Sequence, residues 1–152
     1  MRISIVFISN IILGFSFIAL LMSCSPKLAL PLKGGKVYLM DSESTFNIYP
    51  TNNYIITAAE NCIIERILIV DDSYSVIVNG KFKIIYTNIY QCFIHKGDIL
   101  KKGDAIGQLK STMSDWNYLT VGIRELTGKN SKKITSCKKP FVIQHQQVYM
   151  PN

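Results

Sequence analysis

The sequence is poor in the side chains that hold metal ions. Its 152 residues include two histidines, His95 and His145, and four cysteines, no two of which have C-x-x-C spacing. Protein zinc sites are built mainly from clustered histidine and cysteine side chains, so the sequence offers no such motif. We therefore expect no bound metal or other cofactor, and we expect both histidines to be solvated surface residues.

Two further absences restrict the fold and the partner. After residue 30, no window carries the apolar spacing of an amphipathic helix, which argues against a helical domain. The basic residues are not interleaved with aromatic ones as on a nucleic-acid-binding surface, so nucleic acid is not expected as a partner. The length allows one domain as a prior.

A long apolar run is present only at the start of the chain. Arg2 is followed by an apolar run over residues 3–22. This pattern is typical of a secretory signal, although about 20 apolar residues also suffice for a retained transmembrane helix. The letters "LMSC" at 21–24 resemble the lipobox of bacterial lipoproteins. We therefore expect a signal peptide over 1–23, a lipid anchor on Cys24 and a place in the bacterial cell envelope, as a periplasmic or outer-membrane lipoprotein.

Charge and cysteine content describe the part of the chain after the signal. The formal net charge is +7, and removing Arg2 with the signal leaves 16 basic against 10 acidic residues. Outside the cytoplasm, this balance favours anionic lipid head groups or anionic cell-wall polymers as partners.

The three remaining cysteines permit one disulfide and leave one free thiol. Their pairing stays open, and burial as small apolar residues is the default for Cys62 and Cys92.

Beyond the signal, the sequence predicts an all-β domain. Residues 24–36 contain two prolines and two glycines, which is typical of a linker. The segments that follow are rich in isoleucine, valine and tyrosine, which fit a pleated surface, and Asn79-Gly80 is a strong hairpin signal. Strands are expected at residues 37–40, 54–58, 62–70, 75–79 and 82–89, and near 141–144 in a C-terminal tail over 128–152. We expect a single antiparallel β-sandwich or open barrel over residues 37–127.

Alternation along residues 82–89 indicates which side chains share a face. One face carries Phe82, Ile84, Tyr86 and Asn88, and the other carries Lys83, Ile85, Thr87 and Ile89. Because both faces carry apolar side chains, we expect the sheet to have a second layer or a barrel-like closure.

A short phrase occurs twice between residues 95 and 109. Lys96-Gly97-Asp98 returns as Lys102-Gly103-Asp104. Each copy predicts a turn, because glycine adopts a positive φ readily and aspartate can hydrogen-bond the nearby backbone.

The order of these features resembles one protein family. The double turn in Ile94–Gly107, the preceding segment Ile84–Ile89 and the closing strand "YLTVGIRE" from Tyr118 resemble the LytM or lysostaphin-type zinc metallopeptidases, which cut peptide bonds of bacterial peptidoglycan. The resemblance covers about residues 42–127 and implies the fold of the duplicated hybrid motif. Biotinyl and lipoyl carrier domains share the double turn without this order of hairpin and closing strand.

The residues with which the family holds zinc are missing. The resemblance places a His-x-x-x-Asp motif near residues 42–46, beside Asp41 and Glu43, a Tyr-x-His histidine at Asn88, and a His-x-His pair at Tyr118 and Thr120. A phenol and a threonine hydroxyl remain protonated at neutral pH, and zinc prefers nitrogen, thiolate or carboxylate ligands.

The resemblance therefore implies a catalytically inactive, peptidase-like member of the family. Such a protein would bind peptidoglycan or activate cell-wall hydrolases, as inactive LytM-type domains do for peptidoglycan amidases. The groove would be lined or flanked by Phe46, Asn88, Tyr118, Thr120 and Arg124, for which ordinary strand packing is the alternative role. The alternative function is an active zinc metalloendopeptidase of peptidoglycan with rearranged ligands. A transporter adaptor, which shares the motif, would need long flanking helices for which the chain is too short.

Overall fold

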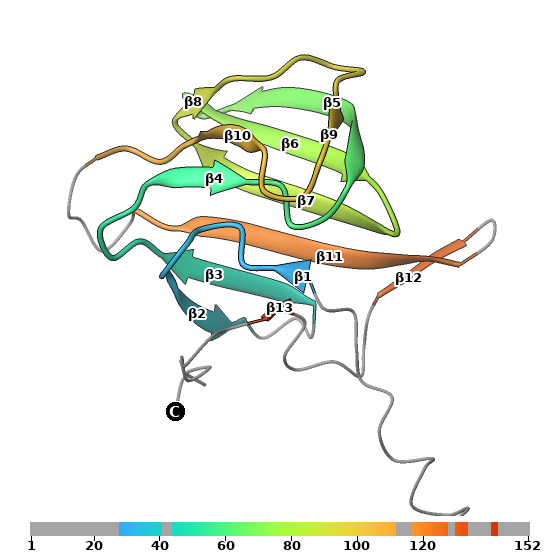
Figure 1. Cartoon of the computed structure of the whole chain (residues 1–152), viewed down its shortest axis with the longest axis horizontal. Helices are drawn as coiled ribbons and strands as arrows, with labels where there is room; N and C mark the ends of the chain where they lie inside the picture. The colour runs from blue at the N-terminus through green and yellow to red at the C-terminus, as the bar shows by residue number, and fades with distance from the viewer. Residues whose placement is uncertain (1–27, 41–43, 112–116, 128–129, 134–140, 143–152) are drawn as a thin grey trace, which may run out of the picture.

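The computed structural model describes residues 28–40, 44–111, 117–127, 130–133 and 141–142, and its regular structure is all β (Figure 1). The strands are β1 (Leu28–Ala29), β2 (Lys36–Leu39), β3 (Thr45–Tyr49), β4 (Ile55–Thr57), β5 (Cys62–Val70), β6 (Ser73–Asn79), β7 (Phe82–Ile89), β8 (Gln91–Cys92), β9 (Ile99–Leu100), β10 (Ala105–Gln108), β11 (Leu119–Thr127), β12 (Asn130–Lys133) and β13 (Phe141–Val142). The predicted all-β class is confirmed. Within the described ranges, no helix has the length and apolar character needed to cross a bilayer.

Most strands belong to one large antiparallel sheet. Its order is β2-β3-β11-β7-β6-β5-β9, and β12 pairs with the far end of β11. The long strand β11 has β3 on one side and β7 on the other. Strands β4, β10 and β8 form a second antiparallel sheet, and β1 pairs in parallel with β13. In Figure 1 the second sheet lies beside the β5-β6-β7 part of the large sheet.

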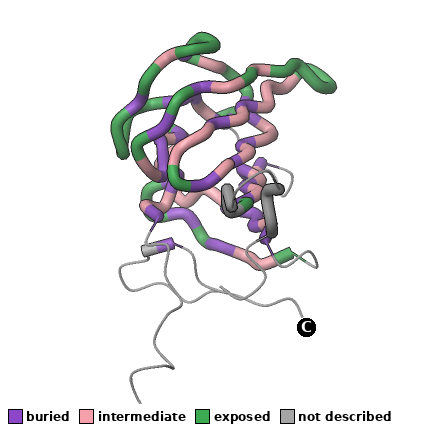
Figure 2. Tube along the Cα trace, turned by 90° about the vertical axis from the view of Figure 1, so that its right-hand side faces the viewer, coloured by how far each residue is buried: buried purple, intermediate pink, exposed green. Residues whose placement is uncertain are grey.

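The hydrophobic core lies on one face of the large sheet. The inward-facing side chains Ile84, Tyr86 and Val121 are fully buried, together with Ile56 of β4 and Ile106 of β10. In Figure 2 buried residues alternate with intermediate ones along the strands, while exposed residues gather mainly in the outer loops. Because burial of apolar surface is the main favourable term in folding, the predicted second layer has a clear physical origin and is confirmed.

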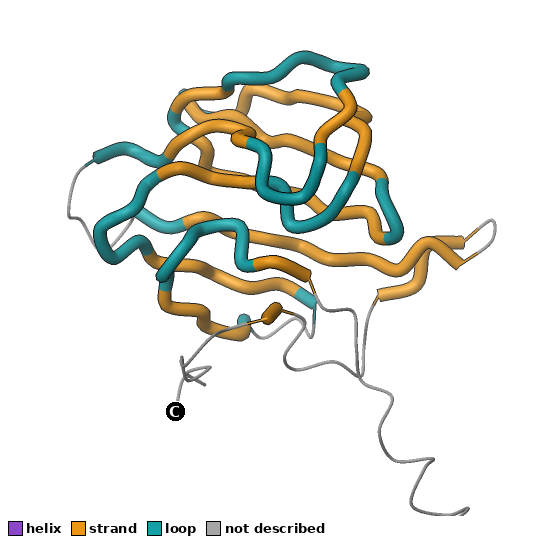
Figure 3. The backbone as a smooth tube through the Cα atoms, viewed as in Figure 1, coloured by secondary structure: helices purple, strands orange, loops and turns teal. Residues whose placement is uncertain are grey.

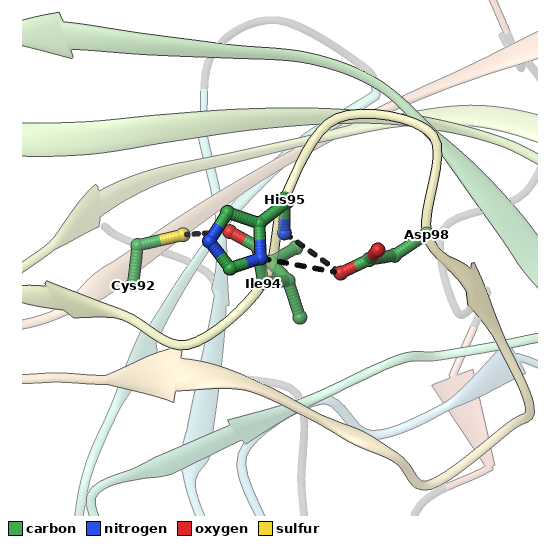
Figure 4. Close-up of polar contacts among 4 residues, drawn as sticks. All are labelled: Cys92, Ile94, His95 and Asp98. Atoms are coloured by element: carbon green, nitrogen blue, oxygen red, sulfur yellow. Dashed lines mark hydrogen bonds and ion pairs between the residues drawn. The ribbon is translucent and has the colours of Figure 1, made fainter.

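The repeated phrase forms two equivalent turns. The glycine of each copy has a positive φ, 91° in the first and 94° in the second. The Oδ2 atoms of Asp98 and Asp104 accept the backbone N–H of His95 at 2.7 Å and of Lys101 at 2.8 Å. These turns lie in the loops around β9 (Figure 3), and Figure 4 shows the first of them. The turn predictions are confirmed.

The alternation predicted along β7 fails at its last two residues. Tyr86 is buried as expected, but the next buried residue is Ile89, and Asn88 is only half-buried. Asn88 has a left-handed φ of 69°, and the pairing of β6 with β7 shifts register between Tyr74 and Val76. An irregularity of this kind disrupts the ladder and re-aims the side chains that follow it. The predicted faces of Asn88 and Ile89 are therefore wrong.

The domain begins before residue 37. Leu28 is 2% exposed and Leu32 is 0% exposed, and β1 pairs with β13. Residues 28–36 thus belong to the packed domain and not to a linker, because Leu28 and Leu32 bury apolar surface, while Pro31 and Gly34 lie where the chain bends. The strand expected near 141–144 is present at Phe141–Val142. The signal over 1–23, Cys24 and Cys137 lie outside the described residues.

Candidate functional site

Three neighbouring strands carry polar side chains at one level of the large sheet. Thr120 of β11 is paired in register with Asn47 of β3 and with Thr87 of β7. The next residues along two of these strands, Val121 and Phe46, pair with each other and are buried in the core. Because side chains alternate along a strand, Asn47, Thr87 and Thr120 share the face that points away from this core.

A hydrogen bond joins β3 to β11 on this outer face. The Thr120 hydroxyl donates to Asn47 Oδ1 at 2.8 Å. Asn47 is only 6% exposed, so this bond is largely shielded from water. Since burial strengthens a satisfied hydrogen bond and penalises an unsatisfied one, the pair fastens the two strands at this level.

The structure corrects the expected place of Phe46. Phe46, which the sequence placed in the groove, is 1% exposed and packs edge-on against the ring of Phe141 at 5.3 Å. Neighbouring residues of a strand point to opposite faces, so Asn47, and not Phe46, lies on the outer face of the sheet. Asp41 and Glu43, the acidic residues near the expected start motif, lie outside the described residues. Phe46 is a core residue and does not line a groove.

Asn88 and Tyr118 lie together at the adjoining end of the strands. Asn88 Nδ2 donates to the backbone oxygen of Tyr118 at 2.6 Å. The Tyr118 ring packs against Tyr49 at 5.1 Å, and Tyr49 packs edge-on against Tyr38 at 5.2 Å. The amide of Asn88 thus ties the end of β7 to the start of β11, and aromatic rings flank this end of the site.

A hollow of about 240 Å³ extends along β11 from Thr120 to Arg124. Its wall includes Ser44 and Thr45 on one side and Ile85 and Thr87 on the other. Gly122 of β11 lies between these walls, and a Cβ atom added there would meet only the Cβ of Ile85, at 3.9 Å. The site therefore has an open floor where most residues would place a side chain.

Sequence reasoning found part of this constellation. Thr120 and Arg124 line the same hollow, and their role in a groove stays a prediction. Asn47, Thr87 and Gly122 were missed, because the sequence does not show which strands pair or in what register. The alternation of "TFNIY" over residues 45–49 is the sequence signal that could have placed Asn47 and Phe46 on opposite faces of the strand.

The described side chains of this site do not fit a zinc ion. In the described part of the chain, no three histidine, cysteine, aspartate or glutamate side chains are grouped to hold a metal. The amide of Asn47 and the hydroxyl of Thr120 are neutral and bond each other. His95 lies on the first turn, with a side chain 89% exposed and its Nδ1 3.9 Å from Asp98 Oδ2 (Figure 4). His145 lies outside the described residues.

Among the described residues, the groups with a shifted pKa lie elsewhere, and none of them lines the hollow. Burial raises the pKa of the Glu60 carboxyl, raises that of the Cys62 thiol to about 11, and raises that of the fully buried Tyr86 phenol. Cys62 is buried and Cys92 half-buried, and both are free thiols. A thiol with a raised pKa is a poor nucleophile, so Cys62 has the structural role expected of it.

Known proteins resemble this chain in structure and not detectably in sequence. No protein-family model matches this sequence, and the search of curated proteins found no match. Csd3 from Helicobacter pylori, in its hexagonal crystal, is similar with a TM-score of 0.55 and 17% identity, over 72% of this chain and 32% of that one. The catalytic domain of the prophage-encoded M23 protein EnpA from Enterococcus faecalis is similar with a TM-score of 0.52 and 13% identity, over 70% and 92% of the chains. A chain of the SpoIIQ–SpoIIIAH pore-forming complex is similar with a TM-score of 0.51 and 14% identity, over 65% and 84%. This chain thus spans about a third of the length of the Csd3 chain.

Proposed function

We propose that this chain, which has the fold of the LytM or M23 peptidases, is a non-catalytic envelope domain that binds peptidoglycan or activates a cell-wall hydrolase. The observation that carries the proposal is the hydrogen bond between Thr120 and Asn47, 2.8 Å long. It joins two neutral groups on neighbouring strands. Thr120 is at a position where the sequence resemblance places a zinc-binding histidine, and Asn47 is one residue beyond the end of the stretch 42–46 where it places the other ligands.

Peptide-bond hydrolysis in this family depends on a metal ion. A catalytic zinc takes about three protein ligands and activates a bound water. Neither an amide oxygen nor a protonated hydroxyl is a strong zinc ligand, and here each is already engaged with the other. The same groups are suitable for recognition, because neutral donors and acceptors beside the Tyr118 ring can hydrogen-bond and pack against a ligand without cleaving it.

The location of the protein is proposed from its sequence. A lipid anchor on Cys24 would hold the domain at a membrane of the envelope, because more than one acyl chain gives stable attachment. The surplus of basic residues, 16 against 10 after the signal, suits a surrounding of anionic wall polymers and head groups. Peptidoglycan and a peptidoglycan amidase are the two partners that this setting favours.

The proposal is tested on the full chain in detergent. We expect no stoichiometric zinc by elemental analysis and no muropeptides released from purified peptidoglycan. We also expect cosedimentation with peptidoglycan, or a rise in the activity of an envelope amidase added to it. The site variant measured beside the wild type is Thr120→Val, which keeps the side-chain shape and removes the hydroxyl that bonds Asn47.

Two results would overturn this function. Stoichiometric zinc and released muropeptides, both reduced in Thr120→Val, would establish the alternative of an active endopeptidase with rearranged ligands. Absence of both cosedimentation and any effect on amidases would remove the support for a binding or regulatory role.

A further inference from the structure

We infer that the hollow over Gly122 is a subsite for a carboxylate-bearing residue of a peptide, with Arg124 as the side chain that recognises the carboxylate. The inference rests on the proposed function, since it takes the peptides of peptidoglycan as the ligand. It adds the chemical group that is recognised and the side chain that determines specificity.

Arg124 is the unpaired cation at the end of the hollow. It is exposed, and no side chain in the described ranges forms an ion pair with it. Lys83, its partner in register on β7, already pairs with Glu65 at 2.8 Å. A guanidinium group presents a planar fork of donors that matches the two oxygens of a carboxylate. The free cation beside the hollow therefore selects a planar anionic group.

The walls of the hollow supply hydroxyl donors. Ser44, Thr45 and Thr87 line it, and none of these hydroxyls makes a side-chain hydrogen bond within the described residues. Ser44 is only 5% exposed, so little of this residue is in contact with water. Among the described residues that line the hollow, none is acidic. Hydroxyl donors beside a cation provide an environment in which a bound carboxylate is stabilised.

The floor at Gly122 is open although the fold does not require a glycine there. Gly122 has no positive φ, and an added Cβ would make one ordinary contact, 3.9 Å from the Cβ of Ile85. Glycine weakens a strand interior and often marks a place where a ligand approaches the backbone closely. A space of about 240 Å³ has the size of a single amino-acid side chain and not of a whole peptide. The hollow is thus suited to one residue of a longer ligand.

The test uses a synthetic peptidoglycan stem peptide with free carboxylates and the same peptide with every carboxylate amidated. Binding to the full chain in detergent is measured by calorimetry for the wild type, Arg124→Gln, Gly122→Val and Arg66→Gln. Arg66 is an exposed arginine on β5 outside the hollow, so it is the matched control for loss of one positive charge. Melting temperatures check that each variant is folded, and Gly122→Ala replaces Gly122→Val if the latter melts early.

We expect the wild type to bind the acidic peptide on the order of tenfold or more tightly than the amidated one, the difference expected for a charge-assisted hydrogen bond. Arg124→Gln should abolish this preference, Gly122→Val should weaken binding of both peptides, and Arg66→Gln should change neither. Inorganic phosphate at the same concentration should not displace the peptide, which separates a carboxylate site from a general anion site.

Several outcomes would overturn the inference. These are no binding of the acidic peptide, equal affinity for the two peptides, an equal effect of Arg66→Gln and Arg124→Gln, or displacement by phosphate. Cosedimentation of the wild type with peptidoglycan in any of these cases would leave the proposed function intact. Zinc-dependent cleavage of the peptide together with an Arg124-dependent preference would overturn the proposed absence of catalysis and leave the carboxylate subsite standing.

Discussion

Replacement of Tyr86 by phenylalanine should destabilise the domain by removing one buried acceptor. Tyr86 is fully buried on β7, immediately before Thr87, and its hydroxyl accepts the backbone N–H of Ala59 at 3.1 Å. Burial raises the pKa of the Tyr86 phenol, so the group stays neutral at ordinary pH. Phenylalanine keeps the ring and its packing and removes only the oxygen.

The magnitude follows from the burial of Ala59. This residue is 1% exposed, so water cannot replace the lost acceptor, and a buried unsatisfied donor costs about 1–3 kcal/mol. For a domain of about 100 residues, a loss of 1 kcal/mol lowers the melting temperature by roughly 4–8 °C. Tyr86→Phe should therefore melt roughly 5–20 °C below the wild type.

Urea denaturation followed by circular dichroism measures this loss. The matched control is Tyr90→Phe, since Tyr90 is 53% exposed and its hydroxyl is open to water. We expect the control to lie within about 0.5 kcal/mol of the wild type, as surface substitutions do. If Tyr86→Phe unfolds at the same urea concentration as Tyr90→Phe, the reasoning that Ala59 depends on this oxygen is refuted.

Two more substitutions test the packing and the electrostatics of the domain. Gly107→Ala should destabilise it by about 1–3 kcal/mol in urea, because the added Cβ would overlap the backbone oxygen of Gln91; an unchanged urea midpoint would contradict that close approach. Glu60→Gln should raise the melting temperature at pH 7, because burial raises the pKa of this carboxyl while glutamine can still accept the Phe82 N–H, which now bonds Glu60 at 2.8 Å. Because the pKa of Glu60 is raised in the folded state, its charged form lowers the stability of the wild type at pH values above that pKa. This cost is absent below the ordinary pKa of 4.5, where the carboxyl is protonated in both the folded and the unfolded state. The gain in melting temperature from Glu60→Gln should therefore vanish at low pH. A gain that is the same at every pH would show that burial of the charge is not its cause.

Local features of the fold were predictable because the residues that form them are neighbours in the chain. The two glycine turns and the hairpin at Asn79-Gly80 depend on backbone preferences within a few residues. Strand segments on either side of them followed from their isoleucine, valine and tyrosine content. These features sufficed for the all-β class and for the resemblance to one family.

The candidate site was less predictable because it depends on pairing between distant strands. Asn47 and Thr120 are 73 residues apart, and their register is determined by which side chains the core buries. An error of one residue placed Phe46 in the groove, since a slip of one exchanges the faces of a strand. The left-handed conformation of Asn88 and the burial of Leu32 likewise follow from long-range packing that the local sequence does not encode.

The hydrogen bond between Asn47 and Thr120 makes the junction of β3 and β11 independent of metal ions. A metal ion that joins two strands contributes to folding and is lost to chelators or to acid, which protonates its ligands. Here β3 and β11 are fastened by an amide and a hydroxyl, and neither group titrates at physiological pH. Acidification and competition for divalent cations should therefore leave this junction between β3 and β11 unchanged, whereas both would weaken a junction bridged by a metal ion.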